Sequence, residues 1–377
     1  MLKNREINTF NTHNTVGKSM SSKLVLVLLF LFLVSIICFR LDQVNAAPIG
    51  DTHIHNLRTN LDYYTINDAI SANETSNGDT IRVDAGSYFE SVSVTKSVSI
   101  VGEGMENTVI RSWDADPEGV VFAVGANNVT ISGFTIRDAY WGIDTRADYL
   151  TVANCTIANN VEGIRTMYYF GGHTITNNRI ENNRMWGVVM YTNNNTISGN
   201  IISGSRWGIS LNFGLPNRTS GSIVVNNTLM NNTVGCEVRK SDNNTIFLNS
   251  FLNNNRNAAA YDGSVNKWDN GTFGNYWSDY TGSDLNNDGI GDTPYTIDQD
   301  NADHFPLTSP YSYWISPISG DINYDLKVDM RDIAFAAVRL GSWLGGSKWD
   351  ARADVTGDGV IDIKDVVAIA KNFGKHL

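Results

Sequence analysis

The segment NTISGNIISGSRWGIS, residues 195–210, contains the pattern that decides the fold of this 377-residue chain. Two short runs of apolar residues are separated by Gly and Asn, and no apolar spacing of helical period is present. Related phrases recur throughout residues 127–261. Their apolar anchors are spaced 21, 23, 22, 27 and 23 residues apart and are Ile136, Ile157, Ile180, Ile202, Leu229 and Leu252.

A period near 23 residues with three short strands is typical of one coil of a solenoid, because each strand is too short to bury its apolar face alone. Successive coils would then lie about 4.8 Å apart, and the paired asparagines would stack in ladders at the turns. Leucine-rich repeats have a similar period, but they need a Leu-x-x-Leu-x-Leu frame that these phrases lack. We therefore predict an all-β right-handed parallel β-helix solenoid.

The sequences on either side of the repeat resemble known β-helix families. Residues 64–110, which begin YTINDAISANETSNGDT, are similar to the opening of pectin-lyase-like β-helices, where a short helix, here Ile66 to Ala72, caps the end of the barrel. Residues 275–307, which begin NYWSDYTGSDLNNDGIGD, resemble the segment that closes NosD-type and archaeal surface β-helix proteins. These resemblances imply a β-helix domain over residues 61–308.

A glycine recurs in the repeated phrases, and aligning the phrases on it predicts columns of equivalent residues. The residue before the glycine is, coil by coil, Trp141, Glu162, Trp186, Trp207 and Val234. Trp141, Trp186 and Trp207 are candidates for a carbohydrate-binding face, since large amphipathic rings stack on the apolar faces of sugars. The alternative is that they pack over turns as a structural ladder.

Two further columns are predicted to point outward from the same strands. The residue two after the glycine is Asp144, Arg165, Val189, Ser210 or Glu237, and the residue four after it is Arg146, Met167, Tyr191, Asn212 or Arg239. Pectate-lyase-like enzymes bind acidic sugars through calcium on β-helix carboxylates and abstract a proton with an Arg or Lys. The hydrolases related to them use a pair of carboxylates as acid and base. These columns contain neither a clear calcium site with a basic residue nor a clear carboxylate pair. Whether the chain is a polysaccharide lyase or glycoside hydrolase therefore stays open. The weak catalytic candidates are Asp144, Arg146, Arg165 and Glu237.

A different pattern occupies the C-terminal region. The segment DVTGDGVIDIKD, residues 354–365, places oxygen ligands at the six positions of an EF-hand calcium loop and has Gly359 at the sharp turn. The same spacing occurs 33 residues upstream. The expected Ca²⁺ ligands are Asp321, Asn323, Asp325, Lys327, Asp329 and Asp332 in the first loop, and Asp354, Thr356, Asp358, the Val360 carbonyl, Asp362 and Asp365 in the second.

The duplicated loop and following helix resemble a type I dockerin domain, a small all-α calcium-binding module, over residues 320–377. The resemblance implies a cohesin domain as partner and cohesin contacts at loop positions 10 and 11, which are Met330, Arg331, Ile363 and Lys364. Two departures weaken the expected ligation: Leu326 stands where the first loop should have glycine, and Thr356 replaces an acid or amide. Near-duplication also predicts that the module binds in two orientations.

A third, incomplete loop precedes this module. Calcium spacing is repeated, with Gly289 at position 6, by Asp284, Asn286, Asp288, the Ile290 carbonyl and Asp292. Position 12 is Tyr295, so the loop would need a carboxylate from outside, such as Asp298 or Asp300. The alternative is a simple glycine–aspartate turn.

The N-terminal end predicts export. An apolar run, Leu24 to Phe39, follows Lys23 and precedes Val44-Asn45-Ala46, so residues 1–46 are interpreted as a signal peptide, with an uncleaved membrane anchor as the alternative. Residues 47–60 would form the mature N-terminal segment and residues 309–319 a linker. A secreted or cell-surface location is expected, and the net charge of −11 argues against a nucleic-acid partner.

Candidate soft-metal ligands are sparse. Cys155 and Cys236 occupy strand positions expected to face inward, which predicts free buried thiols. The NosD resemblance raises copper delivery, but Cu(I) prefers clustered Cys, Met or His side chains. His53 and His55 near Asp51 are the only dense candidates, and we expect a disordered tail there instead.

These observations lead to one functional hypothesis and one alternative. The first is an exported β-helix that binds or processes extracellular polysaccharide and is attached to a cohesin-bearing partner through a calcium-dependent dockerin. The alternative is a non-enzymatic surface spacer or adhesin anchored in the same way.

Overall fold

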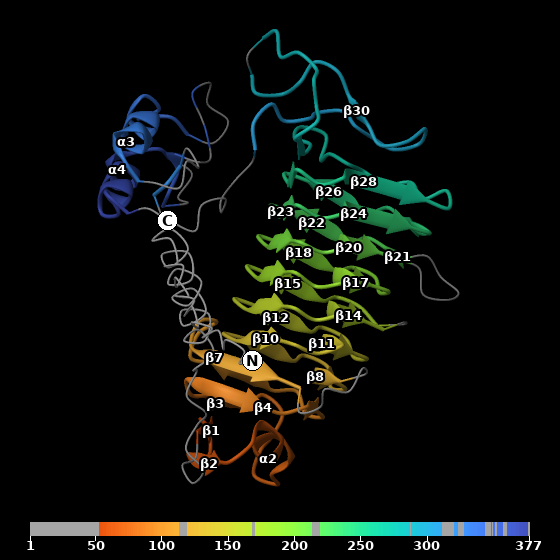
Figure 1. Ribbon diagram of the computed structural model, residues 1–377, viewed down its shortest axis with the longest axis vertical. Helices are drawn as coiled ribbons and strands as arrows, with labels where there is room; N and C mark the ends of the chain where they lie inside the picture. The colour runs from red at the N-terminus through yellow and green to blue at the C-terminus, as the bar shows by residue number, and fades with distance from the viewer. Residues whose placement is uncertain are drawn as a thin grey trace, which may run out of the picture. The chain divides into compact units, whose positions relative to one another are not determined.

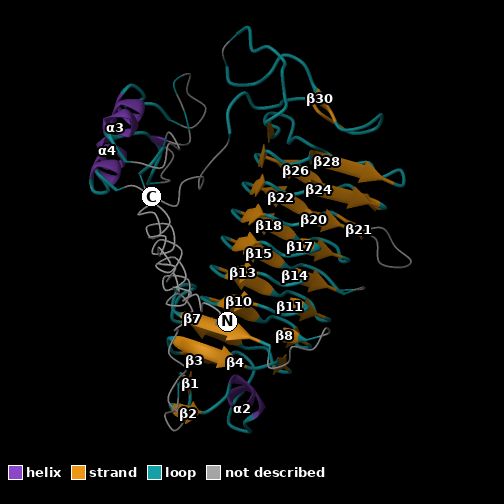
Figure 2. Ribbon diagram, viewed as in Figure 1, coloured by secondary structure: helices purple, strands orange, loops and turns teal. Residues whose placement is uncertain are grey.

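The computed structural model describes residues 53–112, 119–167, 170–212, 219–286, 288–310, 320–322, 328–343, 348, 350, 353–356 and 360–375. The predicted signal peptide and most of the predicted linker lie outside these ranges. Within them the chain forms a parallel β-helix, whose coils are stacked one on the next in Figures 1 and 2, and a pair of C-terminal helices. No helix in the described part of the chain is long and apolar enough to cross a membrane.

The β-helix is built from three sheets. The first contains β1 (Ile54–Asn56), β2 (Leu61–Tyr63), β3 (Thr80–Val83), β6 (Ser99–Gly102), β9 (Thr130–Ser132), β12 (Thr151–Ala153), β15 (Thr174–Thr176), β18 (Thr196–Ser198), β22 (Ile223–Val225) and β26 (Thr245–Phe247). The second contains β4 (Gly86–Phe89), β7 (Thr108–Arg111), β10 (Thr135–Arg137), β13 (Thr156–Ala158), β16 (Arg179–Glu181), β19 (Ile201–Ser203), β23 (Thr228–Met230), β27 (Ser250–Leu252) and β29 (Tyr276–Trp277).

The third sheet carries the candidate site. It contains β5 (Val92–Val94), β8 (Val120–Val124), β11 (Trp141–Thr145), β14 (Glu162–Thr166), β17 (Trp186–Met190), β20 (Trp207–Leu211), β24 (Val234–Arg239) and β28 (Arg256–Tyr261). Two small pairs complete the strands: β21 (Thr219–Ser220) with β25 (Ser241–Asp242), and β30 (Tyr295–Thr296) with β31 (Ala302–Asp303).

The predicted right-handed parallel β-helix is therefore confirmed. Five apolar anchors lie in one register on the second sheet and are buried, namely Ile136, Ile157, Ile180, Ile202 and Leu229. The sixth anchor is Phe251 and not Leu252, because Leu229 pairs with Phe251. The last spacing, from Leu229 to Phe251, is therefore 22 residues. Side chains alternate along a strand, so the neighbouring Leu252 points away from the core.

Asparagine ladders hold the corners between the sheets. At one corner the backbone N–H groups of Cys155, Asn178, Asn200, Asn227 and Asn249 each donate to the Oδ1 of the ladder asparagine one coil later. A buried amide suits this place because it both accepts and donates, so it satisfies backbone groups that no water reaches. The predicted stacking of the asparagines is confirmed.

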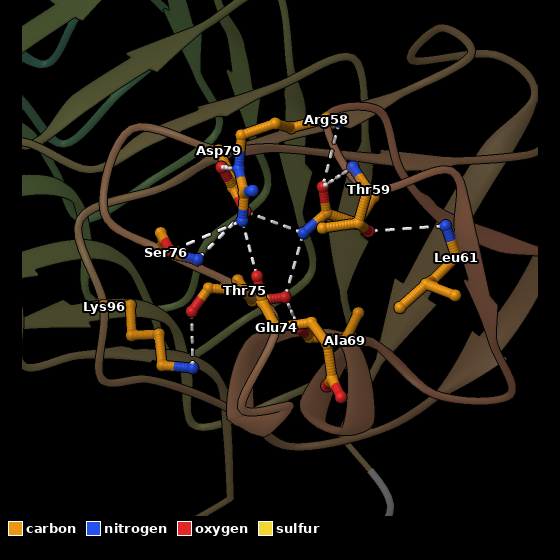
Figure 3. Close-up of polar contacts among 10 residues, drawn as sticks. Arg58, Thr59, Leu61, Ala69, Glu74, Thr75, Ser76, Asp79 and Lys96 are labelled. Atoms are coloured by element: carbon orange, nitrogen blue, oxygen red, sulfur yellow. Dashed lines mark hydrogen bonds and ion pairs between the residues drawn. The ribbon is translucent and has the colours of Figure 1, made fainter.

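The N-terminal end is closed by α2 (Ile66–Ser71), as predicted, with Thr65 as its N-cap. Beside it, Figure 3 shows the buried Asp79 at the centre of a polar network. Its carboxylate pairs with Arg58 and accepts from the Asn56 side chain at 2.8 Å, and Asn56 also donates to Thr75. The Arg58 hydrogen bond, opposed by burial, holds the pKa of Asp79 well below its usual range, so the network stays charged at neutral pH.

Candidate functional site

The columns predicted on the third sheet are confirmed by its register. Trp141 pairs with Glu162, Glu162 with Trp186, Trp186 with Trp207, and Trp207 with Val234. The glycine that follows each of these residues is required by close coil stacking: a Cβ added at Gly208 would lie 2.6 Å from the Gly235 carbonyl oxygen. The coils therefore approach closely at this column.

The tryptophan column is half-buried and stacked. The rings of Trp186 and Trp207 are stacked, with centroids 5.1 Å apart and planes inclined by 15°. The Arg165 guanidinium lies 4.0 Å from the centre of the Trp141 ring, and that of Arg206 lies 4.4 Å from the centre of the Trp207 ring. Trp186 and Trp207 thus form a ladder of two rings, from which Glu162 separates Trp141, and the exposed Arg206 side chain lies over the Trp207 ring.

Glu162 interrupts the tryptophan column and is buried. Its Oε2 atom makes no hydrogen bond in the described structure, and neither do the buried indole nitrogens of Trp141 and Trp186. Burial raises the pKa of Glu162, and the nearby Arg165 opposes that rise. The sequence places Glu162 in this column but does not indicate that it is buried, because its burial depends on the neighbouring coils.

The column two residues after the glycine was expected to face solvent, and that expectation is wrong for most of its members. Asp144, Val189, Ser210 and Glu237 are buried, while Arg165 is partly exposed. Ion pairs and hydrogen bonds between neighbouring coils explain the burial of the carboxylates. Arg165 Nε lies 2.8 Å from Asp144 Oδ1, and Ser210 Oγ donates to Glu237 at 2.8 Å.

The predicted catalytic candidates therefore fall into two groups. Asp144, Arg146 and Arg165 lie together, with Arg146 Nε 3.8 Å from Asp144, whereas Glu237 pairs with Arg239 at 3.2 Å. Four strand spacings separate β11 from β24, which is about 19 Å. Paired acid and base carboxylates in glycosidases are about 5–9.5 Å apart, so Asp144 and Glu237 cannot work as such a pair.

Three arginines that sequence reasoning did not single out flank the tryptophan column. Arg184 and Arg206 precede Trp186 and Trp207 in the turns, and Arg256 continues the column one coil after Val234. All three are exposed, and none has a carboxylate partner among the residues that the structure describes; Arg256 donates to the Ala258 carbonyl and the Tyr261 hydroxyl. The sequence signal was the recurrence of Arg just before Trp-Gly, in RMWG and SRWG.

The C-terminal loops lead into α3 (Met330–Ala337) and α4 (Ile363–Ala370). Both helices begin with the same capping box, in which the backbone N–H of Asp329 or Asp362 donates to the side chain of Asp332 or Asp365 at 2.8 Å. The predicted duplication is thus visible in matching helix starts, and the two helices share a small apolar core.

The acids of these loops are unusually buried. Asp332 and Asp365 are fully buried, and Asp321 and Asp354 nearly so. Asp332 and Asp365 also accept backbone N–H groups of their loops, from Ile322 and Thr356 respectively. Burying a carboxylate is costly unless it is paired or hydrogen-bonded. Among the described residues of these loops, no three His, Cys, Asp or Glu side chains converge on a metal site, so the two calcium sites stay a prediction. Several predicted partners lie outside the described residues: Asn323, Asp325, Lys327 and Asp358.

The third predicted loop forms a compact turn. Asp284 accepts backbone N–H groups from Asp288 and Gly289 at 3.1 and 3.0 Å, and Asp292 accepts from Leu285 at 2.8 Å. Asp298 instead accepts from Asp300 and Asn301. Asp300 lines a separate cavity of about 490 Å³ together with Asp269 and His304.

Soft-metal ligands are not gathered in the described residues. No three His, Cys, Asp or Glu side chains there converge closely enough to hold a metal ion. Cys155 and Cys236 are free and buried, as predicted, and burial raises the pKa of Cys155 to about 12. The His and Cys side chains of the described residues therefore do not fit a copper centre.

The expected disordered N-terminal tail is wrong. His55 lies in β1, which pairs antiparallel with β2 and β3, and its two ring nitrogens lie 2.6 Å from Asp62 and 2.9 Å from Asp84. Burial lowers the pKa of His55, but its hydrogen bonds to Asp84 and Asp62 outweigh burial and raise the pKa overall. The sheet therefore begins before the predicted boundary at residue 61.

Comparison with known proteins gives one family match. The family model described as "Periplasmic copper-binding protein (NosD)" matches residues 72–282. The "Probable ABC transporter binding protein NosD" of Stutzerimonas stutzeri is 31% identical over 134 residues, which are 32% of this chain and 31% of that protein. A "Cell surface glycoprotein" of Methanothermus fervidus is 30% identical over 126 residues, which are 33% of this chain and 20% of that protein. The matches thus span about a third of these relatives or less.

Solved structures resemble the chain at the level of the fold. The A-module of the mannuronan C-5 epimerase AlgE4 of Azotobacter vinelandii is 18% identical, with a TM-score of 0.40, and the match covers 54% of this chain and 70% of that one. An alginate lyase from Paenibacillus sp. is 15% identical, with a TM-score of 0.39, and the match covers 53% and 89%.

Proposed function

The chain belongs to the NosD family of β-helix proteins, and we propose that it is an exported protein that binds extracellular polysaccharide along the outward face of its third sheet. The observation that carries this proposal is the column of half-buried tryptophans beside exposed arginines, in which Trp186 and Trp207 lie on successive coils and Trp141 lies two coils before Trp186. Because ring faces here are covered by each other or by Arg165 and Arg206, an extended chain of sugar units would contact the exposed ring edges and these arginines. A cell-surface location agrees with the resemblance to a surface glycoprotein.

Binding without chemistry is favoured by the state of the candidate catalytic groups. Asp144 is held by Arg165 and Glu237 by Ser210 and Arg239, and both carboxylates are buried. General acid–base catalysis needs a carboxyl group within hydrogen-bond reach of the scissile bond, which these two groups cannot provide while buried and paired. A non-enzymatic surface spacer, the alternative function, has the same paired carboxylates but needs no ligand.

A polysaccharide array separates these proposals. We expect the full chain to bind at least one extracellular polysaccharide and to release neither reducing ends nor 4,5-unsaturated uronates. Trp186→Ala should abolish the binding, whereas Tyr64→Ala, which removes an exposed aromatic residue from the N-terminal end, should not. Failure of every polysaccharide to bind would favour the spacer, and product release would restore the enzymatic hypothesis.

We also propose that residues 320–377 form a dockerin that folds around Ca²⁺ and attaches the β-helix to a cohesin. The residues that would hold the ions are the oxygen donors of the two loops, led by Asp321, Asp332, Asp354 and Asp365. Supporting observations are the burial of these four acids and the matching capping boxes. Bound Ca²⁺ would supply the charge that keeps buried carboxylates ionised and the loops closed.

The cohesin contact is proposed at the start of each helix. Met330 and Ile363 are 61% and 64% exposed, which is unusual for apolar residues of such a small module, and each is followed by a basic residue. Binding of the chain to a cohesin from the same organism, lost on chelation, would support this part of the proposal. Binding that survives chelation would contradict it.

A further inference from the structure

The exposed arginines beside the tryptophan column bear on the charge of the ligand. We infer that the polysaccharide bound at this face is anionic and that Arg184, Arg206 and Arg256 recognise its carboxylate or sulfate groups. This inference rests on the proposed function, because it concerns the same face, but it can fail while the proposed function stands.

The register places the three cations within two residues of the tryptophan column: Arg184 two residues before it, Arg206 one residue before it, and Arg256 in it. Arg206 lies over Trp207, and Trp207 stacks on Trp186, two residues after Arg184. Arg256 is in register with Val234, which is in register with Trp207, so Arg256 follows Trp207 by two strand spacings, about 10 Å. A linear polymer lying along the β-helix axis would meet all three arginines in succession.

The ion pairs on this sheet involve other arginines and leave these three available to bind an anionic ligand. Arg165 and Arg239, on the same sheet, are ion-paired with Asp144 and Glu237. Within the described ranges, no carboxylate pairs with Arg184, Arg206 or Arg256, although the chain carries a net charge of −11. Glu181, the acid closest in sequence to Arg184, is paired with Arg179 at 2.6 Å.

A row of exposed cations whose charge no carboxylate of the described residues neutralises concentrates anions at that row. Hydrogen bonds to the Ala258 carbonyl and the Tyr261 hydroxyl hold the Arg256 side chain without cancelling its charge. The guanidinium also has the geometry to bind carboxylate or sulfate oxygens in pairs.

Stacking on Trp207 prepares Arg206 for this role. A guanidinium that lies flat on a ring keeps its N–H groups directed along its edges, where an anion can reach them. The aliphatic stem of the arginine is fixed at the same time, so less conformational entropy is lost on binding. Neutral sugars would use the ring edges alone and would bind more weakly.

The test compares polymers that differ only in charge. Affinity gel electrophoresis and calorimetry of the full chain would use polygalacturonate against its fully methyl-esterified form, and dextran sulfate against dextran. We expect the charged member of at least one pair to bind at least tenfold more tightly than its neutral form, with an affinity that falls as NaCl is raised from 0.05 to 0.5 M, on the screening argument. The two pairs separate carboxylate from sulfate recognition.

Variants locate the effect. Arg206→Gln and Arg184→Gln remove one charge each but keep part of the stem, and each should lower affinity for the charged polymer about tenfold, as expected for a lost charged hydrogen bond. Lys267→Ala removes an exposed lysine that follows the last strand of the third sheet, and should change affinity less than twofold. Far-UV circular dichroism checks that every variant is folded.

Three outcomes decide the matter. Equal binding of the charged and neutral polymers, lost in Trp186→Ala, overturns the charge inference and leaves the proposed function standing. Unchanged affinity in both arginine variants also overturns the inference. Binding of no polymer overturns the proposed function itself.

Discussion

Replacing Asn227 by alanine should destabilise the β-helix by about 4 kcal/mol. The side chain is fully buried in the corner ladder, and its Oδ1 accepts the Asn200 backbone N–H at 3.0 Å. Its Nδ2 donates to the Ile197 carbonyl at 2.8 Å. Alanine would leave that N–H without its acceptor and remove a donor from that carbonyl. The unpaired N–H group costs about 1–3 kcal/mol, and the lost Nδ2 bonds to the Ile197 carbonyl and Asn249 Oδ1 cost about 0.5–1.5 each, so the total is about 2–6.

Aspartate at the same position adds a pH signature. Its second oxygen would face the Ile197 carbonyl and Asn249 Oδ1, where Nδ2 now donates. The folded state would accept the carboxyl group best when it is protonated, so its folded pKa would lie above the unfolded value of about 3.9. The stability of Asn227→Asp should therefore be greatest below about pH 4 and fall as the pH rises towards neutrality.

Urea unfolding of the full chain, followed by the strand signal in far-UV circular dichroism, measures both effects. The matched control is Asn226→Gly, next in the chain: Asn226 is exposed and adopts a positive φ of 57°, which glycine tolerates. Its free energy of unfolding should change by less than about 1 kcal/mol. A loss below about 1 kcal/mol for Asn227→Ala, or equal to the control, would refute the reasoning that the ladder satisfies buried backbone groups.

Three further predictions concern other parts of the molecule. Burial lowers the pKa of His173 to about 4, so the free energy of unfolding should fall by about 3 kcal/mol as the unfolded state protonates between pH 6.5 and 4. His173→Asn should remove this loss, and an unchanged pH profile in the variant would contradict the assignment. EDTA should melt α3 and α4 while the strand signal persists, and a helical signal unaffected by chelation would count against calcium-dependent folding. Arg331→Ala or Lys364→Ala alone should barely weaken cohesin binding, whereas the double variant should weaken it strongly; abolition by one single change would exclude two binding orientations.

Much of the β-helix could be predicted because its sequence signals are local and repeated. Gly142, Gly163, Gly187 and Gly208 mark the register directly, since close stacking of coils excludes a side chain at each of these positions. The anchor positions follow from strand alternation, except at the last coil, where Phe251 and Leu252 are both apolar and only pairing distinguishes them. Spacing alone therefore predicts which residues share a column.

Exposure within a column could not be predicted in the same way. Alternation places Asp144 and Glu237 on the outer side of their strands, yet both are buried because Arg165, Ser210 and Arg239 on the same or adjacent coils pair with them. That no carboxylate in the described part of the chain pairs with Arg184 or Arg206 is equally hard to predict from the sequence, because it depends on which carboxylates other arginines occupy. Ion pairs between coils thus decide which charged side chains stay exposed, and the sequence of one repeat does not show these pairs.

The same difference between amide and carboxylate explains where the solenoid ends. An asparagine in the ladder accepts from one coil and donates to another, so it carries the pattern forward, whereas a carboxylate can only accept. The last ladder asparagines, Asn257, Asn275 and Asn301, donate to Asp279, Asp303 and Asp298 respectively. Asp303 accepts the backbone N–H groups of Asn275 and Phe305 and the Trp277 indole, and burial raises its pKa to about 6. An amide there would offer one acceptor oxygen and leave a buried N–H group facing a donor. In the closing segment, aspartates therefore accept the hydrogen bonds of the last ladder asparagines. Because a carboxylate has no N–H group, these aspartates offer no donor to a further coil.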